Sequence, residues 1–560
     1  MGELRTLPQM LARAAQTDAG VTFLAGAGET RRAYAELQHR SSCIARGLRE
    51  AGFVRGDLVA LVLPDAEQFL TAFFGASIAG VVPASVYPPA TTGDLTEYFD
   101  LTAPILRLAR ARAVVTNASL APGFSRLRDQ CPDLQAVLLH AELDALPLTG
   151  GEVEQPSLDD LAFVQFTSGS TAAPKGIALR HRNVAANIDA FSGPHGLDAG
   201  PADVAVSWLP LYHDMGLVGM TIGAVHTCSP VVLMTPQAFV KRPSDWLRAI
   251  SRYRGTISFA PTFGYDLCVR RVKERELDGL DLSSWRVAGC GAEPIHAPTL
   301  AAFARKFAPA GFRSTSLLPS YGLAEHVVAA TFAPTGRPPR VQRIAADAVA
   351  IGGVAARARN EDIPTVEVVS CGRPFPGHLL RIVGADGRLL PERMVGEIAL
   401  AGPSVMLGYH RQDDLTAQTI REGWLYTGDL GYLAGGELFV CGRAKDIIIV
   451  NGRKYHPQDL EWAAGGVAGV RRGRVVAFGV SEAGRGDRVV IVLEPNGTVP
   501  ADVLTDSIRR RISDRFGLCV DAVAFVPAGT VGRTTSGKVQ RAATKARYER
   551  GELLDVQEPV

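Results

Sequence analysis

Apolar residues in the first two thirds of the chain repeatedly follow a helical period and then form a short continuous run. Residues 30–52 carry apolar side chains at helical spacing, and the run DLVALVLP at residues 57–64 is typical of a buried strand. The same order recurs at residues 69–87 and 246–260. Helices that alternate with buried strands predict a parallel sheet with helical crossovers. We therefore expect a large α/β body that runs from about residue 1 to about residue 370.

The pattern changes after this body. Between Val366 and Leu438, short apolar runs alternate with Gly, Pro and Asp turns, which predicts a small β subdomain. Beyond Gly442 the chain contains further apolar strands and one amphipathic helix, which together predict a small α+β domain. The apolar face of that helix consists of Leu504, Ile508, Ile512 and Phe516.

One segment between these regions lacks any clear period. Residues 335–360 are rich in Ala, Arg and Gly and lie between two well-patterned stretches. A long loop inside a compact domain is usually functional or mobile. We therefore expect an irregular loop with a functional role at this place.

Composition excludes several classes of protein. The 560 residues predict three or four structural units at roughly 150 residues per domain. The net charge of +2 shows no bias toward nucleic acid or an anionic membrane. Eight cysteines are scattered without a C-x-x-C pair, which disfavours a zinc site and a disulfide framework. Because the first residues also lack the features of a secretory signal, we expect a cytoplasmic protein.

Two stretches are free of Asp, Glu, Lys and Arg for long enough to suggest a membrane span. They cover residues 68–93 and 215–240. Both are interrupted by prolines, whereas a spanning helix needs about 20 predominantly apolar residues. We expect a buried helix followed by a buried strand in each stretch, and no membrane span.

The strongest chemical signal is the run FVQFTSGSTAAPKG at residues 163–176. A predicted strand leads into a turn of hydroxyl-bearing and small residues, and Lys175 follows. Backbone N–H groups and hydroxyls in such a turn can donate to phosphate oxygens, while the lysine supplies positive charge. The run is not a Walker A loop, because no Gly precedes Lys175 directly and no Ser or Thr follows it. We predict a phosphate cradle made of Thr167, Ser168, Gly169, Ser170 and Thr171.

Five runs in fixed order point to a family. They are SGSTAAPKG (168–176), PSYGLAEH (319–326), GWLYTGDLG (423–431), GRAKDIIIVNGRKYHPQDLE (442–461) and GRTTSGKVQR (532–541). Together they resemble the core motifs of the adenylate-forming superfamily, which includes acyl-CoA synthetases, nonribosomal adenylation domains and luciferases. The resemblance covers nearly the whole chain.

Other runs are similar to those of one subfamily, the fatty acyl-AMP ligases. They are GVVPASVYPP (80–89), SWLPLYHDMGLVGM (207–220), TISFAPTFGYDLCVRR (256–271) and WRVAGCGAEPI (285–295). The segment between Glu325 and Gly372 resembles the insertion that distinguishes these ligases from acyl-CoA synthetases. That insertion is associated with delivery of the acyl group to an acyl carrier protein and not to free coenzyme A.

The resemblance implies an α/β fold with a large N-terminal domain of α/β subdomains, a small β-barrel-like subdomain and a small mobile C-terminal α+β domain. We expect an adenylation domain at residues 1–440 that binds ATP and a fatty acid, with its insertion at about 335–360. A hinge at 441–446, which contains Asp446, would lead to a lid at 447–560.

For the reaction, the resemblance implies that a fatty carboxylate attacks the α-phosphate of ATP and displaces pyrophosphate. The cradle and Lys175 would hold the β- and γ-phosphates, and Glu325 would hold Mg²⁺. Lys538, in the run TTSGKVQR, would reach both the carboxylate and the α-phosphate and so bring two anions together. His213 is expected to act where the acyl chain meets the nucleotide.

The same resemblance implies a nucleotide site and an acyl pocket. Asp429 would accept hydrogen bonds from both ribose hydroxyls, Arg443 would reinforce that contact, and Tyr321 would stack on adenine unless it is simply a core aromatic. The expected nucleotide site also contains Gly291, Ala292, Glu293, Ser320, Gly322 and Leu323. The expected fatty-acid pocket consists of His213, Asp214, Met215, Gly219, Met220 and Phe263.

Three functions remain open at this point. The first is a ligase that forms fatty acyl-AMP and acylates a carrier protein, and the second is an acyl-CoA synthetase. The third is an inactive relative that binds a nucleotide or acyl group. It is disfavoured by the joint presence of Glu325, Asp429, Arg443 and Lys538. We expect a monomer or weak dimer. The basic segment from Arg533 to Arg550 either docks an acidic carrier protein or is an exposed cationic helix.

Overall fold

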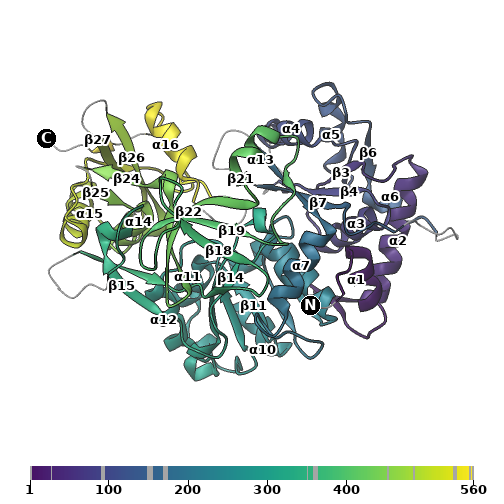
Figure 1. The fold of residues 1–560 in the computed structure, drawn as a ribbon, viewed down its shortest axis with the longest axis horizontal. Helices are drawn as coiled ribbons and strands as arrows, with labels where there is room; N and C mark the ends of the chain where they lie inside the picture. Colours follow the sequence, from purple (N-terminus) through teal and green to yellow (C-terminus); the bar gives the residue numbers. More distant parts are fainter. Residues whose placement is uncertain are drawn as a thin grey trace.

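The protein combines several α/β layers in an elongated molecule whose N-terminal half and C-terminal end lie at opposite ends (Figure 1). A computed structural model describes residues 3–26, 28–89, 95–147, 155–167, 174–349, 351–356, 364–450, 453–482, 486–533, 539–553 and 556–557. The mixed α/β fold predicted from the sequence is confirmed.

Two large sheets form the body of the molecule. The first has the order β17-β14-β13-β12-β11-β9-β10-β1-β2, and its central strands from β13 to β1 run parallel. Its strands are β1 (Gly20–Ala25), β2 (Gly28–Ala33), β9 (Ala205–Ser207), β10 (Val231–Met234), β11 (Ile257–Ala260), β12 (Val287–Cys290), β13 (Leu317–Tyr321), β14 (Thr331–Phe332) and β17 (Arg373–Pro374).

The second sheet has the order β20-β8-β7-β4-β3-β5-β6. Its strands are β3 (Leu58–Leu61), β4 (Val82–Ser85), β5 (Ala113–Thr116), β6 (Ala136–Leu139), β7 (Leu161–Thr167), β8 (Lys175–Arg180) and β20 (Gly408–Tyr409). β20 comes from far along the chain and pairs with β8, so that Tyr409 lies opposite Ile177. This pairing brings residues near position 409 beside Lys175.

Helices cover these sheets and link their parallel strands. They are α1 (Leu7–Ala14), α2 (Tyr34–Glu50), α3 (Ala66–Ile78), α4 (Thr96–Ala109), α5 (Ala121–Arg126), α6 (His140–Asp144), α7 (His181–Ser192), the π-helix η2 (Met215–Ile222), α8 (Gly223–Thr227), α9 (Pro236–Lys241), α10 (Ser244–Arg252), α11 (Thr262–Arg271) and α12 (Ala297–Phe307). Both charge-free stretches prove to be a buried helix followed by a strand, as predicted. Within the described ranges no helix is long and apolar enough to cross a membrane.

A smaller antiparallel sheet follows the body. It contains β18 (Leu379–Val383), β19 (Gly396–Ala401), β21 (Ile420–Arg421), β22 (Trp424–Ala434) and β23 (Glu437–Arg443), with α13 (Asp413–Thr419) beside it. It corresponds to the predicted β subdomain. Asp429 of β22 lies opposite Arg443 of β23, so this sheet carries two of the predicted nucleotide residues.

The C-terminal unit contains every described element beyond the 3-10 turn η8 (Ala444–Asp446). Its sheet has the order β26-β27-β28-β29, and three helices, α14, α15 and α16, pack on it. The elements are β24 (Ile448–Val450), β25 (Arg453–Tyr455), α14 (Pro457–Gly465), β26 (Val470–Glu482), β27 (Gly486–Pro495), α15 (Ala501–Phe516), β28 (Ala522–Phe525), α16 (Arg541–Glu549) and β29 (Val556–Gln557).

The prediction of an irregular loop at residues 335–360 is wrong for much of that segment. β15 (Val341–Ala345) pairs antiparallel with β16 (Thr365–Val369), and the short turn of helix η7 (Ala346–Val349) follows β15. Exposed and buried side chains alternate along β15. One strand of five residues is too short to stand out in an Ala- and Arg-rich stretch.

Candidate active site

One large cavity lies between the body and the C-terminal unit. Its volume is about 790 Å³. Residues of β13, β22, β23 and the loop after β12 meet residues of α14 and α16 along its wall. The predicted site residues that line it are Lys175, His213, Asp214, Met215, Gly219, Ala292, Glu293, Ser320, Tyr321, Gly322, Leu323, Glu325, Asp429, Arg443 and Asp446.

The remaining predicted residues lie elsewhere. Met220 is buried in the core, and Phe263 packs against Trp208 with ring centroids 5.6 Å apart. Gly291 packs against Ser320. Thr167 ends β7, and its backbone pairs with that of Lys175. The predicted Ser168, Gly169, Ser170, Thr171 and Lys538 lie outside the described residues.

Asp429 is held by two donors at the base of the cavity. The Tyr321 hydroxyl donates to Oδ2 at 2.8 Å, and Nε of Arg443 lies 2.9 Å from Oδ1. Burial and the nearby carboxylate of Asp429 raise the pKa of Tyr321, and the same carboxylate raises the pKa of Arg443. The carboxylate is therefore fixed in direction, and its remaining lone pairs can accept from the vicinal hydroxyls of a sugar.

Glu325 is oriented by a residue that the sequence did not reveal. The Tyr409 hydroxyl donates to Oε1 of Glu325 at 2.9 Å, and the ammonium of Lys175 lies 5.2 Å from the centroid of the Tyr409 ring. Burial and the Glu325 carboxylate both raise the pKa of Tyr409. One tyrosine therefore contacts the predicted metal carboxylate and the predicted phosphate lysine. No periodicity or motif spacing in the sequence predicts the role of Tyr409, because β20 pairs with β8 only in the folded protein.

The donor set at Glu325 fits Mg²⁺. A carboxylate is a hard oxygen ligand, and Oε1 is already directed by Tyr409. In the part of the chain that the structure describes, no group of three or more His, Cys, Asp and Glu side chains could hold a metal ion. An ion bound by Glu325 would therefore take its other ligands from nucleotide phosphates and water, as Mg²⁺ commonly does.

His213 and Asp214 form a pair at the cavity wall. Nδ1 of His213 lies 2.6 Å from Oδ1 of Asp214, which also accepts from the backbone N–H of Met215 at 2.7 Å. The Met215 N–H also lies 3.3 Å from Nδ1, but it makes its shorter contact with the carboxylate. Since a carboxylate only accepts, we assign Nδ1–H as the donor to Asp214, and Nε2 is the ring nitrogen that remains for a substrate. Asp214 thus fixes the tautomer of the His213 imidazole. It is also the N-cap residue of η2.

An apolar arm of the cavity extends away from these polar groups. It is lined by Phe191 of α7, Leu197, Phe259 of β11 and Phe332 of β14. The ring of Phe332 lies 5.8 Å from that of Phe259 and 6.4 Å from that of Phe191. Sequence reasoning missed these four residues, because an apolar residue in a predicted helix or strand is usually core.

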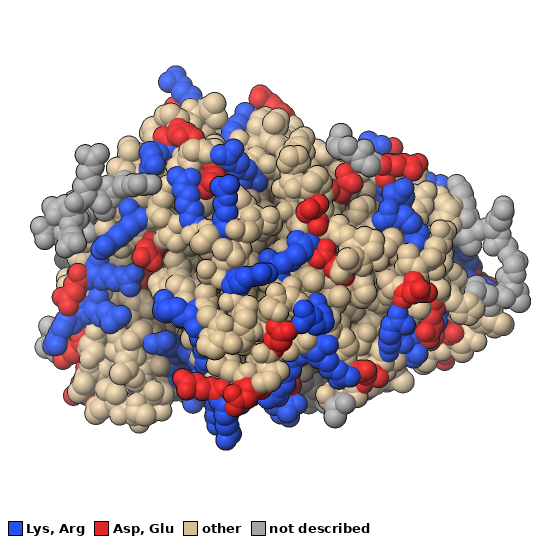
Figure 2. All heavy atoms as spheres, turned by 90° about the horizontal axis from the view of Figure 1, so that it is seen from below, with Lys and Arg blue, Asp and Glu red and all other residues tan. Residues whose placement is uncertain are grey.

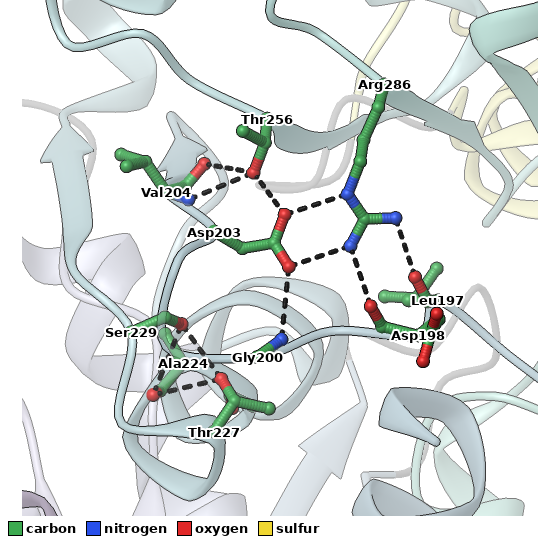
Figure 3. Close-up of polar contacts among 11 residues, drawn as sticks. Leu197, Asp198, Gly200, Asp203, Val204, Ala224, Thr227, Ser229, Thr256 and Arg286 are labelled. Carbon is green, nitrogen blue, oxygen red and sulfur yellow. Dashed lines mark hydrogen bonds and ion pairs between the residues drawn. The ribbon is translucent and has the colours of Figure 1, made fainter. Parts of the chain in front are cut away.

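An ion pair fixes the loop that carries Leu197 (Figure 3). Arg286 donates from Nε and Nη2 to Asp203, both at 2.8 Å, and from Nη1 to the carbonyl oxygen of Leu197 at 2.7 Å. Nη2 also donates to the carbonyl oxygen of Asp198 at 3.1 Å. Burial opposes ionisation of Asp203, but the hydrogen bonds from Arg286 and Thr256 hold its pKa below the usual range. This arginine clamp makes one wall of the apolar arm rigid.

The predicted hinge region is packed against the C-terminal unit. At Gly442, φ is +152° and a β-carbon would lie 2.4 Å from Nδ1 of His456, so only glycine fits. Asp446 accepts from Nη1 of Arg541 at 2.7 Å, and Arg541 also pairs with Glu461 at 2.9 Å. The chain after β23 is therefore tied to both α14 and α16.

The predicted insertion shares a hydrophobic core with the C-terminal unit. Ile344, Val349 and Ala355 are buried in one cluster that also contains Leu460 and other residues of that unit. Nε2 of His456 donates to the carbonyl oxygen of Val349 at 2.9 Å. The segment that includes β15 and η7 is thus in direct contact with the unit that carries α14.

Comparisons with known proteins agree with this geometry. The model of the AMP-binding enzyme family matches residues 11–410. A putative acyl-CoA synthetase of Caulobacter vibrioides is 37% identical over 98% of this chain and 96% of its own. The medium-chain-fatty-acid–[acyl-carrier-protein] ligase JamA of Moorena producens is 34% identical over 93% of this chain and 90% of its own.

A solved structure from work on fatty acyl-adenylate ligases of E. coli and L. pneumophila is also similar. It superposes with a TM-score of 0.92 and is 36% identical, and the match covers 98% of this chain and 100% of that one. The chain therefore belongs to the AMP-binding enzyme family. It is an adenylate-forming ligase, and its resemblance to the fatty acyl-AMP ligases is confirmed.

Proposed function

We propose that this enzyme is a fatty acyl-AMP ligase that activates a fatty acid with ATP and Mg²⁺ and then acylates the phosphopantetheine thiol of an acyl carrier protein. The continuous cavity is the main support, because it joins polar groups suited to a nucleotide to an arm closed by phenylalanines. We further propose a cytoplasmic location, because all eight cysteines are unpaired and thiols stay reduced there.

In the first half-reaction the chain's own residues would position two anions. Asp429 would bind the ribose hydroxyls, and Lys175 with the cradle would hold the β- and γ-phosphates. Mg²⁺ at Glu325 would neutralise charge on the leaving pyrophosphate. His213, oriented by Asp214, would donate from Nε2–H, when protonated, to the fatty carboxylate or the α-phosphate. The apolar arm would bury the acyl chain and exclude water.

Lys538 is proposed to join these two anions in the transition state. Its ammonium would contact the carboxylate and the α-phosphate together, so Lys538→Ala should lower adenylate formation by orders of magnitude while ATP binding changes little. Pyrophosphate release and ATP titration calorimetry measure the two effects separately. Pyrophosphate release at the wild-type rate would contradict the assignment.

The carrier protein as acceptor is supported by two observations. The relative JamA is named for activity on an acyl carrier protein. Ile344, Val349 and Ala355 of the predicted insertion are buried in the core of the C-terminal unit, where they would restrict the pose needed for coenzyme A. The proposed lid at residues 447–560 would swing about the hinge at 441–446 between adenylation and transfer.

One assay tests the proposal. The enzyme is incubated with ATP, Mg²⁺ and a series of fatty acids, and acyl-adenylate and pyrophosphate are quantified. Holo-carrier protein or coenzyme A is then added to the loaded enzyme. We expect acyl-adenylate to form with each fatty acid that is a substrate. The acyl group should then be transferred to the carrier protein and not to coenzyme A.

The second candidate function is an acyl-CoA synthetase. The Caulobacter vibrioides relative is named a putative enzyme of that kind. Acyl-CoA formed at a rate equal to carrier acylation would favour this candidate. Absence of any acyl-adenylate would instead favour an inactive nucleotide- or acyl-binding relative.

A further inference from the structure

The cavity reaches the surface beside α14. Pro294 lines the cavity and is exposed, as expected where a cavity opens to solvent. Across the opening, Asp459 and Trp462 of α14 line the cavity as well. The Trp462 ring packs on the imidazole of His296, with ring centroids 4.4 Å apart. One mouth of the cavity therefore lies between α14 and the loop after β12.

Three exposed arginines surround this mouth on the C-terminal unit. Arg511 of α15 lies against the end of α14, where its Nη2 is 3.3 Å from the point that a β-carbon on Gly466 would occupy. Arg472 belongs to β26 and Arg515 to α15, and both elements share a buried core with α14. Burial and the positive charges of Arg515 and Arg472 together lower the pKa of His296 to about 4. Arg472, Arg511 and Arg515 are termed the arginine rim below.

The arginine rim carries free positive charge. All three residues are exposed, and within the described ranges none of them forms an ion pair with a carboxylate. Seen from below, Lys and Arg side chains are spread over the face of the molecule, and several lie at the left, the side on which Figure 1 places α14 and α15 (Figure 2). Unpaired guanidinium groups on a surface favour contact with carboxylates of a partner.

The basic segment that the sequence suggested for docking is different, because its described charges from Arg541 to Arg550 are paired within the chain. Arg541 binds Asp446 and Glu461, and only 18% of its side chain is exposed. Lys545 lies 3.8 Å from Glu549. Further along α16 and beyond it, Arg547 and Arg550 both pair with Glu552. A partner would have to break these pairs before binding there.

We propose that the arginine rim is the docking surface for an acidic carrier protein whose thiol-bearing arm enters the cavity between α14 and the loop at 293–296. The proposal rests on the proposed function, which requires such a partner. Docking at the rim places the carrier over a mouth of the cavity that also contains Glu325 and Asp429. Complementary charge would mainly raise the rate of encounter, which salt screens.

The test uses the full-length enzyme with charge reversal at the rim. In one variant Arg472→Glu is combined with Arg515→Glu, and in a second Arg472→Glu is combined with Arg511→Glu. We expect pyrophosphate release within about twofold of wild type, and KM for an acidic holo-carrier protein raised roughly tenfold or more. Transfer to free pantetheine, which has no acidic surface, should be unchanged.

A matched control separates the rim from total charge. Arg126→Glu with Arg128→Glu reverses two exposed arginines near α5, at the opposite end of the molecule, and should leave KM for the carrier unchanged (Figure 1). The proposed docking surface is overturned if both rim variants leave KM for the carrier protein unchanged. It is also overturned if the control variant raises this KM as much as the rim variants do. Wild-type enzyme that adenylates a fatty acid yet acylates no carrier overturns the proposed function as well, so the two failures are distinguishable.

Discussion

Tyr409 connects two charged side chains whose roles were predicted separately. Its hydroxyl orients the Glu325 carboxylate, and its ring supports the ammonium of Lys175. Thr416 of α13 accepts from the Tyr409 backbone N–H at 2.8 Å, and the Cβ-free Gly408 lets this strand approach Thr416. Tyr409, which has no proposed contact with the substrate, therefore positions Glu325 and Lys175 relative to each other, and both of these are proposed to act on the nucleotide phosphates.

Loss of the Tyr409 hydroxyl should weaken metal binding more than folding. Tyr409→Phe keeps the ring beneath Lys175 and removes only a hydrogen bond to a carboxylate, worth about 1.5–3 kcal/mol. We expect the Mg²⁺ concentration for half-maximal activity to rise about tenfold, with a parallel weakening of Mg·ATP binding by calorimetry. Tyr432→Phe is the matched control, because that buried hydroxyl contacts Gln342 at 3.2 Å. Equal Mg²⁺ requirements in both variants would contradict the role given to Tyr409.

At the scale of elements, the insertion belongs to the core of the C-terminal unit. Along β15, Ile344 is fully buried in that core whereas Val341 is 42% exposed. In addition, the imidazole of His456 donates a hydrogen bond to the backbone carbonyl oxygen of Val349. Removal of residues 335–360 as a block would therefore expose the core, so a point substitution tests this contact more cleanly.

Ile344→Ala should loosen the C-terminal unit, and Val341→Ala should not. Truncation of a buried Ile usually costs about 2–5 kcal/mol through lost burial and the cavity left behind. We expect a lower midpoint of thermal unfolding and faster proteolysis near residues 441–446 for Ile344→Ala only. If the insertion also restricts coenzyme A, the same variant should begin to form acyl-CoA. Identical stability of the two variants would show that β15 does not support the unit.

The elements show what could be read from sequence. The regular alternation of apolar patterns correctly predicted that residues 34–50 form a helix, α2, and residues 58–61 a strand, β3. The order of the motifs singled out Asp429, Arg443 and Glu325, and these three residues line one cavity. Short pairings could not be predicted. β20 and β15 are defined by partners far away in the chain, and the acyl arm is formed by apolar residues that look like any core residue until the strands are assembled.

At the scale of the whole molecule, stability depends on histidines buried without charge. Burial lowers the pKa of His181 to about 4 and that of His326 to about 3. In His181, Nδ1 accepts from the backbone N–H of Leu7, which requires the neutral ring. The unfolded chain binds these protons near pH 6.5, so each histidine contributes stability that is present above that pH and is lost as the pH falls toward 4.

Acidification should therefore destabilise the protein before its carboxylates are protonated. Between pH 7.5 and pH 5, each of the two histidines should lower the free energy of unfolding by about 2 kcal/mol. His181→Asn keeps an acceptor for Leu7 but does not titrate, so the fall in unfolding temperature between pH 7.5 and pH 5 should be smaller than in wild type. Scanning fluorimetry across this range provides the measurement. A pH profile parallel to that of wild type would contradict the assignment.

The arginine clamp at the apolar arm has a consequence for how such an enzyme can diversify. Arg286 holds the loop through the backbone carbonyl oxygens of Leu197 and Asp198, and not through their side chains. The side chain at position 197 can therefore change size without weakening the clamp. A lineage could lengthen or shorten the space for its substrate one substitution at a time, while the frame that defines that space is inherited intact.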